Sequence, residues 1–408
     1  MDDLGGRTVT LVLVSPAGEV LGALPPFPVA TPWWQEVSGL ATEGRQVLRL
    51  LHGDRPAPPG GNVTYLAEIS GDAPAGLTPV EADLAPHPRR AAYAEVGGPA
   101  ASVSWARGEL GGPAVTAHQQ RTWNLSAIWR LDGRDGRPVA WLKQVPSFFA
   151  HEPAVIRLVD SVAPGLVPPL IAEGGSGRML LAHVPGTDRY GAGADVCEAI
   201  AEAFHPVQVE LARRVTPGPP YLAADLGPDI VEMAGGRAWE TGAAVAIPDG
   251  RIDVERIARV AEPHLGEIEG LGELIDDLPR RLAEVAECGL PDTLVHGDLH
   301  PGNARTDDRG RLTIMDWGDC LIGNPAFDIL RLTERLDDPD PVLHAWAYRW
   351  RKARPGTRPE RAAELLRPVA ALRSAVVYAD FVASIEPSEW PYHAADVPAC
   401  LAASIVKG

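Results

Sequence analysis

The sequence predicts an α+β protein in which strands dominate the first part of the chain and helices the rest. Short apolar segments separated by Gly, Pro and Asp turns recur up to residue 186, which is typical of strands. Beyond that point, apolar residues recur at helical spacing. Of the 408 residues 45% are hydrophobic, and Gly (42) and Pro (40) together stay below the level that indicates disorder. The chain is therefore expected to be folded.

Residues 1–95 are expected to form a small accessory α+β domain. Residues 7–24 have the pattern of a β-hairpin, with a Ser-Pro-Ala-Gly turn between two apolar strands. Residues 40–51 predict a short helix, and residues 63–69 predict a further strand. Trp33 and Trp34 are interpreted either as core residues or, with a lower weight, as a stacking platform for a ligand.

Residues 100–186 are expected to form a second β-rich lobe. Residues 121–131 predict a strand, a turn and a second strand, and residues 138–145 predict a third strand. Lys143 lies late in this third strand, and Glu152 opens a predicted helix. Residues 178–186 predict a last strand that runs into a Pro-Gly bend. Without further context, Lys143 would be an exposed lysine at a strand end and Glu152 an acid favoured by the helix dipole.

Residues 187–408 are expected to form a mainly helical lobe. Apolar spacing predicts one helix over residues 195–215, in which Pro206 should cause a kink or an end. The Gly- and Pro-rich stretch of residues 216–250 predicts an irregular insertion, either a linker or a substrate lid. Further helices are predicted in these ranges: two within 252–287, then 329–336, 341–351 and 358–385.

The formal charge of −17 argues against nucleic acid as a partner, because phosphate backbones require a basic surface. A cationic small molecule is easier to accommodate, although acidity that serves solubility alone is an equal alternative. The first residues lack the basic and apolar segments of a signal peptide, and no apolar run approaches the length of about 18 residues that spans a membrane. We therefore expect a cytoplasmic protein without a membrane partner. The four cysteines are scattered and predict neither a disulfide framework nor a zinc site.

Polar side chains follow two short apolar segments between residues 294 and 319. His296, Asp298 and Asn303 follow the first segment, and Asp316 and Asp319 follow the second. Phosphoryl transfer needs a carboxylate that orients a hydroxyl, and Mg²⁺ needs hard oxygen ligands. Asp298 suits the first task, and Asn303 and Asp316 suit the second. An ordinary hairpin with turn-forming residues would explain the polarity of this stretch but not the order of its residues.

These residues resemble the motifs of the aminoglycoside phosphotransferase and choline kinase family, which are small-molecule kinases related in fold to protein kinases. The H-G-D-x-x-x-x-N motif is matched from His296 to Asn303, and the I-D-W/F-[GE]-D motif is matched from Met315 to Asp319. The resemblance covers residues 121–385 and implies a bilobal protein-kinase-like fold. It also implies that Asp298 is the catalytic base, that Asn303 and Asp316 hold Mg²⁺, and that His296 braces the loop. Asp328, at the end of a G-x-P-x-x-D run, would anchor the loop backbone.

The same resemblance implies a site for ATP or GTP. Lys143 would reach the phosphates and pair with Glu152, and the backbone of Ala182, His183 and Val184 would meet the adenine edge. The sequence departs from the protein-kinase pattern at residues 123–126, where Trp-Asn-Leu-Ser replaces a glycine-rich loop. Which backbone N–H groups contact the phosphates is therefore left open.

The resemblance implies transfer of the γ-phosphoryl group to a hydroxyl of a small molecule. An aminoglycoside or another sugar-bearing antibiotic is the favoured acceptor, with resistance or self-protection as the outcome. The alternatives are a metabolite kinase that acts on an amino sugar, choline or homoserine, and a nucleotide-binding pseudokinase. Acidic residues that could meet acceptor ammonium groups, with two possible stacking residues, are Asp319, Glu334, Asp337, Asp338, Asp380 and Glu386, with Trp390 and Tyr392.

Overall fold

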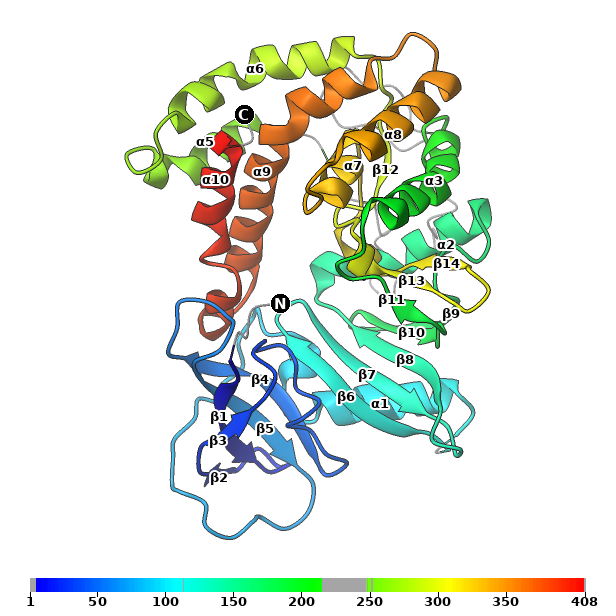
Figure 1. The fold of residues 1–408 in the computed structure, drawn as a ribbon. Helices are drawn as coiled ribbons and strands as arrows, with labels where there is room; N and C mark the ends of the chain where they lie inside the picture. The colour runs from blue at the N-terminus through cyan, green and yellow to red at the C-terminus, as the bar shows by residue number, and fades with distance from the viewer. Residues whose placement is uncertain (1–4, 113, 215–246, 248, 251, 407–408) are drawn as a thin grey trace. The chain divides into compact units, whose positions relative to one another are not determined.

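The computed structural model describes residues 5–112, 114–214, 247, 249–250 and 252–406. The chain divides into two compact units, of which the first comprises Met1–Ala150, Leu170–His183 and Tyr378–Val397. The second comprises His151–Pro169, Val184–Val377 and Pro398–Gly408. Strands make up most of the first unit and helices most of the second (Figure 1), which confirms the α+β class. The insertion predicted at residues 216–250 lies outside the described residues, apart from 247, 249 and 250.

The first unit begins with a five-stranded sheet. Its strand order is β2-β1-β5-β4, with β3 also paired to β1, and β1 runs parallel to β5. The predicted hairpin and the predicted strand at residues 63–69 are confirmed. This sheet and the second sheet described below belong to the same compact unit. The strand bounds are β1 Arg7–Val14, β2 Val20–Ala23, β3 Phe27–Val29, β4 Arg45–Gly53 and β5 Asn62–Ile69.

The helix predicted at residues 40–51 is wrong, because this stretch contains strand β4. Val47 and Leu50 are buried in a cluster with Trp34 and Tyr65, whereas Leu48 is buried in a second cluster with Leu66. Both faces of the strand are therefore covered, so the run Val47-Leu48-Arg49-Leu50-Leu51 is apolar on both sides of Arg49 and does not alternate strictly. Such a run cannot be distinguished from a buried helix by periodicity alone.

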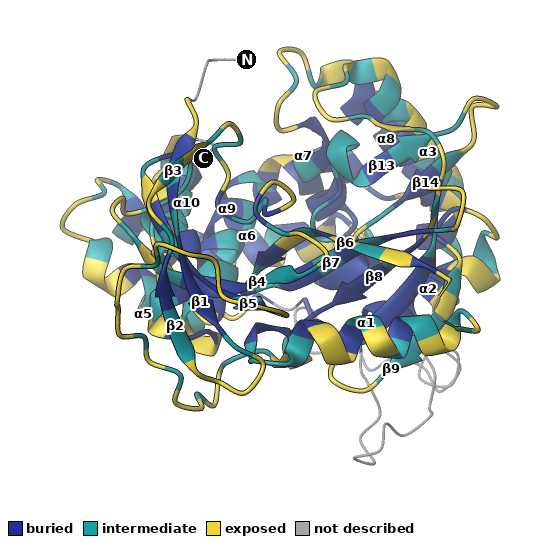
Figure 2. Cartoon of the chain, turned by 90° about the horizontal axis from the view of Figure 1, so that it is seen from below, coloured by how far each residue is buried: buried dark blue, intermediate teal, exposed yellow. Residues whose placement is uncertain are grey.

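A second five-stranded sheet has the order β6-β7-β8-β10-β9. Helix α1 (Gly98–Glu109) covers one of its faces through a cluster that includes Ala106 and Trp129. In Figure 2 strand β8 is buried, while α1 has an exposed face. The strands predicted within residues 121–131, 138–145 and 178–186 are confirmed. The bounds are β6 Thr116–Trp123, β7 Ser126–Asp132, β8 Pro138–Gln144, β9 Leu170–Gly174 and β10 Arg178–Ala182.

The second unit is built mainly from helices, as predicted. Pro206 does not end α3, which runs from Ala194 to Leu211. Pro206 is exposed, whereas Phe204 and Val207 are buried, so packing of the inner face holds the helix through the proline. No helix within the described ranges is long and apolar enough to cross a membrane. The other helices are α2 Glu152–Val162, α5 Val254–Ala261, α6 Leu271–Glu287, α7 Ala326–Thr333, α8 Asp340–Ala353, α9 Pro359–Ser384 and α10 Asp396–Val406.

Two small sheets in the second unit carry the polar loops. Strand β12 (Thr293–Val295) pairs with β15 (Leu321–Gly323). Strand β13 (Ala304–Thr306) pairs with β11 (Thr187–Asp188) and with β14 (Leu312–Ile314). The residues that follow β12 and β14 are those singled out in the sequence.

Candidate active site

Asp298 and Asn303 lie side by side in the loop after β12. The chain turns through residues 296–300 into a short 3-10 helix, Pro301–Asn303. The side-chain amide of Asn303 donates to the Asp298 carboxylate (Nδ2 to Oδ2, 3.1 Å) and to the Asp298 carbonyl oxygen (3.0 Å). The structure therefore brings together two of the three side chains predicted for this site.

Asp316 is joined to the same loop through the backbone. The Met315 N–H donates to the Asn303 carbonyl oxygen (2.7 Å), directly before Asp316 in the chain. Asp316 is exposed and adopts the left-handed conformation (φ 62°, ψ 66°). This conformation costs a non-glycine residue about 1–2 kcal/mol, although Asp tolerates it better than most. Backbone strain of this kind is concentrated at functional sites.

His296 connects the two loops from a fully buried position. Its Nε2 lies 2.9 Å from the Met315 carbonyl oxygen, and its Nδ1 accepts from the Asp298 N–H at 3.3 Å. Because a carbonyl oxygen can only accept, Nε2 carries the proton and the ring is the neutral tautomer. Burial lowers the pKa of His296, which is consistent with a neutral ring. His296 therefore braces both loops in the way that the resemblance implies.

Gly297 occupies the position that is arginine in protein kinases, and the structure requires glycine there. Its φ is +85°, in the left-handed region. A Cβ at this position would lie 2.0 Å from the Asp319 carbonyl oxygen. The loop after β14 thus passes too close to Gly297 for any side chain.

Asp328, on α7, binds the backbone of the catalytic loop. Its two carboxylate oxygens accept from the N–H groups of His296 (3.0 Å) and Gly297 (3.2 Å), and Oδ2 also accepts from Gln208 Nε2 (2.9 Å). Burial raises the pKa of Asp328 to about 7, although both backbone N–H groups act to lower it. Asp328 therefore has the contacts of a loop anchor and is buried away from solvent.

Two partners of Asp298, His300 and Arg331, were missed by the sequence reasoning. Arg331 Nε donates to Asp298 Oδ1 (2.8 Å), and His300 Nε2 lies 3.4 Å from Oδ2. Burial raises the pKa of Asp298, but the hydrogen bonds and charges of His300 and Arg331 outweigh it and hold this pKa well below its ordinary value. Asp298 is therefore ionised at any ordinary pH. Arg331 and Asp328 are three residues apart on one helix, so their side chains lie on the same face. This spacing is the sequence signal that could have predicted Arg331 beside the loop.

The residues predicted to bind the nucleotide are distributed over both units. Lys143 is buried at the end of β8 in the first unit. Glu152 begins α2 in the second unit, and its Oε1 accepts from the Trp317 N–H (3.2 Å), which connects α2 to the loop after β14. The pairing of Lys143 with Glu152 stays a prediction. At the predicted hinge of Ala182, His183 and Val184, the backbone N–H of His183 donates to the Val139 carbonyl oxygen (3.1 Å), so this N–H is not available to adenine.

Of the acidic residues predicted for the acceptor, Glu334 is linked to Asp298 through Arg331. Its carboxylate is ion-paired with Arg331, which is itself bound to Asp298. Asp319 adjoins the catalytic loop through its carbonyl oxygen at Gly297. Asp337 and Asp338 are exposed residues that follow α7.

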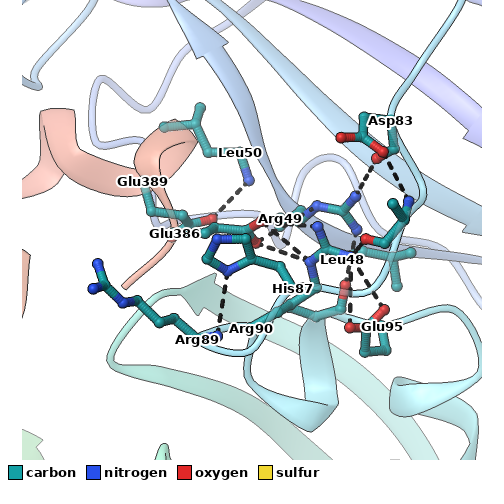
Figure 3. Close-up of polar contacts among 12 residues, drawn as sticks. Leu48, Arg49, Leu50, Asp83, His87, Arg89, Arg90, Glu95, Glu386 and Glu389 are labelled. Carbon is teal, nitrogen blue, oxygen red and sulfur yellow. Dashed lines mark hydrogen bonds and ion pairs between the residues drawn. The ribbon is translucent and has the colours of Figure 1, made fainter. Parts of the chain in front are cut away.

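The remaining candidates, Asp380, Glu386, Trp390 and Tyr392, belong to the first unit. The expectation of a substrate carboxylate is wrong for Glu386, which is buried and binds Arg49 and Arg90 (Figure 3). Tyr392 is a buried core residue that contacts the ring of Trp34, so it is not a stacking wall. Trp34 is buried in the same core, so it is a core residue and not a stacking platform for a ligand. Asp380 and Trp390 are exposed.

The donor atoms around Asp298 fit Mg²⁺ bound together with phosphates. Because Asn303 uses its amide nitrogen on Asp298, its Oδ1 is left to face a cation, and Asp316 offers an exposed carboxylate. Within the described ranges no three His, Cys, Asp or Glu side chains cluster as a metal site. One carboxylate and one amide oxygen suffice for Mg²⁺, which keeps waters and takes phosphate oxygens.

Comparison with known proteins adds a family match. The model of the phosphotransferase enzyme family matches residues 134–365, more than half of the chain. No curated protein matches the chain.

Several solved structures are similar to the chain at low identity. A choline/ethanolamine kinase family protein from Mesorhizobium loti is 13% identical, with 75% of this chain and 94% of that chain covered and a TM-score of 0.49. A macrolide 2′-phosphotransferase from Brachybacterium faecium is 16% identical, with 70% and 92% covered and a TM-score of 0.47. An aminoglycoside phosphotransferase solved with AMP-PNP and hygromycin B is 15% identical, with 75% and 97% covered and a TM-score of 0.46. At these identities and TM-scores, none of their acceptors is assigned to this chain.

Proposed function

The chain belongs to the phosphotransferase enzyme family and is a small-molecule phosphotransferase with a protein-kinase-like fold, and from this premise we propose its reaction. It transfers the γ-phosphoryl group of ATP or GTP to a hydroxyl of a sugar-bearing antibiotic such as an aminoglycoside. The observation that carries the proposal is the set of contacts that join Asp298, Asn303 and the Asp316 loop. Inactivation of the antibiotic would follow from the transfer.

Asp298 acts on the acceptor hydroxyl. Its ionised carboxylate accepts a hydrogen bond from the hydroxyl and aims the oxygen at the phosphorus atom. Because His300 and Arg331 hold its pKa low, Asp298 is a weak base, which first orients the hydroxyl and then takes its proton as the O–P bond forms. A weak base suffices, since the transition state of phosphoryl transfer is loose and takes little help from proton removal.

Asn303 and Asp316 hold the metal, and Lys143 binds the phosphates. Mg²⁺ held by these two side chains would supply positive charge against the triphosphate. Asn303 contacts Asp298 directly, so the metal ligand and the residue that orients the hydroxyl are fixed against each other. His296 and Asp328 keep the loop rigid beneath them. The presence of both Asp298 and Asp316 argues against the pseudokinase alternative, which the loss of either residue would have favoured.

The side chains near Asp298 favour, as a second candidate acceptor, a metabolite that carries a carboxylate, such as homoserine. His300, Arg331 and Arg335 are basic, whereas Glu334 is already ion-paired with Arg331. The Arg335 guanidinium lies 5.4 Å from the centroid of the Tyr190 ring and donates to the Tyr190 hydroxyl (2.5 Å). This surrounding is less suited to a polycation than to an acceptor with a neutral or anionic group. An acidic cleft for an aminoglycoside would have to come from other residues.

The test is an ADP-release screen with the full chain, Mg²⁺ and either ATP or GTP. The acceptor panel contains aminoglycosides, macrolides, nucleoside antibiotics, amino sugars, choline and homoserine. We expect acceptor-dependent ADP release, with a product heavier than its acceptor by one phosphoryl group and NMR that locates the phosphate on a hydroxyl oxygen. ADP release that no member of the panel increases, together with no phosphorylated product, would contradict the proposal.

A further inference from the structure

Tyr190 presents an exposed aromatic ring beside the loop that carries Asp298. The residue is 64% exposed. A Cβ added at Gly302 would lie 2.8 Å from Cδ2 of Tyr190, so the ring lies directly against this glycine of the catalytic loop. The ring also meets His300 edge to face, with 6.5 Å between the ring centroids. All four residues belong to the second unit.

Backbone contacts hold Tyr190 in this place. Strand β11 ends two positions before it and pairs with β13, which directly follows Asn303. The Arg189 N–H donates to the Ala304 carbonyl oxygen (3.1 Å), and the Tyr190 N–H donates to Asp188 Oδ1 (3.2 Å). The exposed ring is therefore attached to the small sheet that also carries the catalytic loop.

His300 connects the Tyr190 ring to the carboxylate that we expect to receive the acceptor hydroxyl. Its Nδ1 accepts from the Gly302 N–H (3.0 Å), and its Nε2 lies 3.4 Å from Asp298 Oδ2. The imidazole is thus fixed between the loop backbone and Asp298. An acceptor with its hydroxyl at Asp298 has the rings of His300 and Tyr190 as its neighbours.

Arg335 binds the hydroxyl end of the same ring. Its Nη1 donates to the Tyr190 hydroxyl, and its exposed guanidinium follows α7, the helix that carries Arg331. Glu334, which lies between the two arginines in the chain, is ion-paired with Arg331. Tyr190 and Arg335, called the Tyr190–Arg335 pair below, therefore combine an exposed ring with an exposed fork of N–H donors.

The chemistry of the Tyr190–Arg335 pair favours an acceptor that carries a carboxylate. A planar guanidinium matches the geometry of a carboxylate and can bind it with two parallel hydrogen bonds. A tyrosine ring offers a large contact area to the carbon skeleton of a ligand at a low cost in conformational freedom. An ammonium group would instead meet the like charges of Arg331 and Arg335, which disfavours a polycationic acceptor.

We propose that the Tyr190–Arg335 pair recognises the acceptor. Arg335 binds its carboxylate, and Tyr190 packs against the carbon atoms between that carboxylate and the hydroxyl at Asp298. The acceptor class is a hydroxyl compound with a carboxylate, from either of two sources, a sugar acid or a hydroxy amino acid. This inference rests on the proposed function, because Asp298 must receive a hydroxyl before the pair can select the rest of the molecule. Both residues determine specificity and act on acceptor binding.

The test uses the full chain in the ADP-release assay, with two pairs of acceptors that differ only in the carboxylate. Homoserine is compared with 3-aminopropan-1-ol, and glucuronate is compared with xylose. The wild type should prefer the carboxylate-bearing member of at least one pair by about 10-fold or more in kcat/KM. The pair that shows this preference identifies the acceptor as an amino acid or as a sugar acid.

Variants of the two residues should change acceptor recognition in different ways. Arg335→Gln should lower the preference for the carboxylate by about 10-fold, mainly through a higher KM for the carboxylate-bearing acceptor, because a charge-assisted hydrogen bond is lost. Arg335→Lys keeps the charge but not the planar fork, so it should recover only part of the preference. Tyr190→Ala should raise KM for both members of the pair by about 5-fold, since it removes contact area that they share.

Tyr348→Ala and Lys352→Gln, both on α8, are the matched controls. Tyr348 is 62% exposed, close to the value for Tyr190, and Lys352 is an exposed cation on the same helix. Both controls should keep the wild-type KM and the wild-type preference.

Three results would overturn the inference: an unchanged preference in Arg335→Gln, an equal loss of preference in Lys352→Gln, or a wild type that phosphorylates other acceptors of the screen but prefers neither carboxylate-bearing probe. A wild type that phosphorylates none of the probes and no member of the screen would instead refute the proposed function.

Discussion

The paired contacts of His300 and Arg331 with Asp298 predict how the rate should depend on pH when both partners are removed. The perturbation is the double variant His300→Leu/Arg331→Met, which keeps apolar volume at both positions and removes both the hydrogen bonds and the positive charge. Arg331 lies 2.8 Å from one carboxylate oxygen and His300 lies 3.4 Å from the other. Each of the three side chains is only about one third exposed or less.

The size of the effect follows from the balance of opposing contributions. Burial acts to raise the pKa of Asp298, and only the two partners reverse the sign. Without them only the hydrogen bond from Asn303 still opposes burial, so for a carboxyl that keeps some solvent the pKa is expected about 1–2 units above the ordinary 3.9. The expected pKa in the double variant is therefore about 5–6. Because the ion pair is partly exposed, its loss should lower the free energy of unfolding by no more than about 1 kcal/mol.

The assay is kcat/KM for the acceptor from pH 5 to 8.5 at saturating Mg·ATP. In the wild type, Asp298 stays ionised over this pH range. Any loss of rate that the wild type shows at the acid end should therefore also occur in the double variant. In the double variant, activity should fall as pH drops through about 5–6, since a protonated Asp298 is a weaker acceptor for the hydroxyl and cannot take its proton. Titration of the nucleotide phosphates is common to both proteins and cancels in the comparison. Superimposable pH profiles would refute the reasoning that these two side chains set the charge of Asp298.

Two further predictions concern the metal ligand Asp316 and the buried carboxyl of Glu389. Asp316→Ala should weaken Mg²⁺-dependent binding of AMP-PNP by at least about 10-fold, while metal-free binding of AMP-PNP is unchanged. Calorimetry with and without Mg²⁺ measures both affinities. An unchanged Mg²⁺ dependence would assign the metal to other ligands. Glu389→Gln should change the pH dependence of stability. Burial raises the pKa of Glu389 to about 8, above its value of about 4.5 in the unfolded chain, so the wild type loses stability as pH rises between these values, by up to about 1.4 kcal/mol per pH unit. The variant should lack this loss, so its Tm should rise relative to the wild type from pH 5.5 to 8, and parallel Tm curves would contradict the assignment.

Local patterns were sufficient where the structure is determined by neighbours in sequence. The turn-bounded strands of both sheets and the order of polar residues from His296 to Asp316 follow from short segments. Gly297 is instructive, because its place beside Asp298 is explained only by the approach of the Asp319 carbonyl oxygen. The motif was readable from the sequence, but the reason for its glycine was not.

The parts that sequence reasoning missed depend on contacts between distant segments. Strand β4 looks helical because both of its faces are covered, which no local pattern reveals. Arg331 reaches Asp298 from a helix 33 positions later. Glu386 was expected to face a cationic substrate, yet it binds Arg90 across 296 positions. An acid just after a helix has the same sequence signature whether it meets a substrate or a buried arginine, and only the partner distinguishes the two cases.

The most direct test of the account is a comparison of Asp298→Asn with the wild type in two measurements made on the same preparations, kcat with the best acceptor of the screen and Kd for Mg·AMP-PNP. The account predicts that kcat falls by about 10²- to 10⁴-fold, while Kd for Mg·AMP-PNP stays within about 3-fold. Asn303→Asp, which keeps an oxygen ligand for the metal but puts a second carboxylate beside Asp298, should instead change the Mg²⁺ dependence of nucleotide binding. Turnover by Asp298→Asn at the wild-type rate would contradict the claim that this carboxylate aligns the acceptor hydroxyl for phosphoryl transfer.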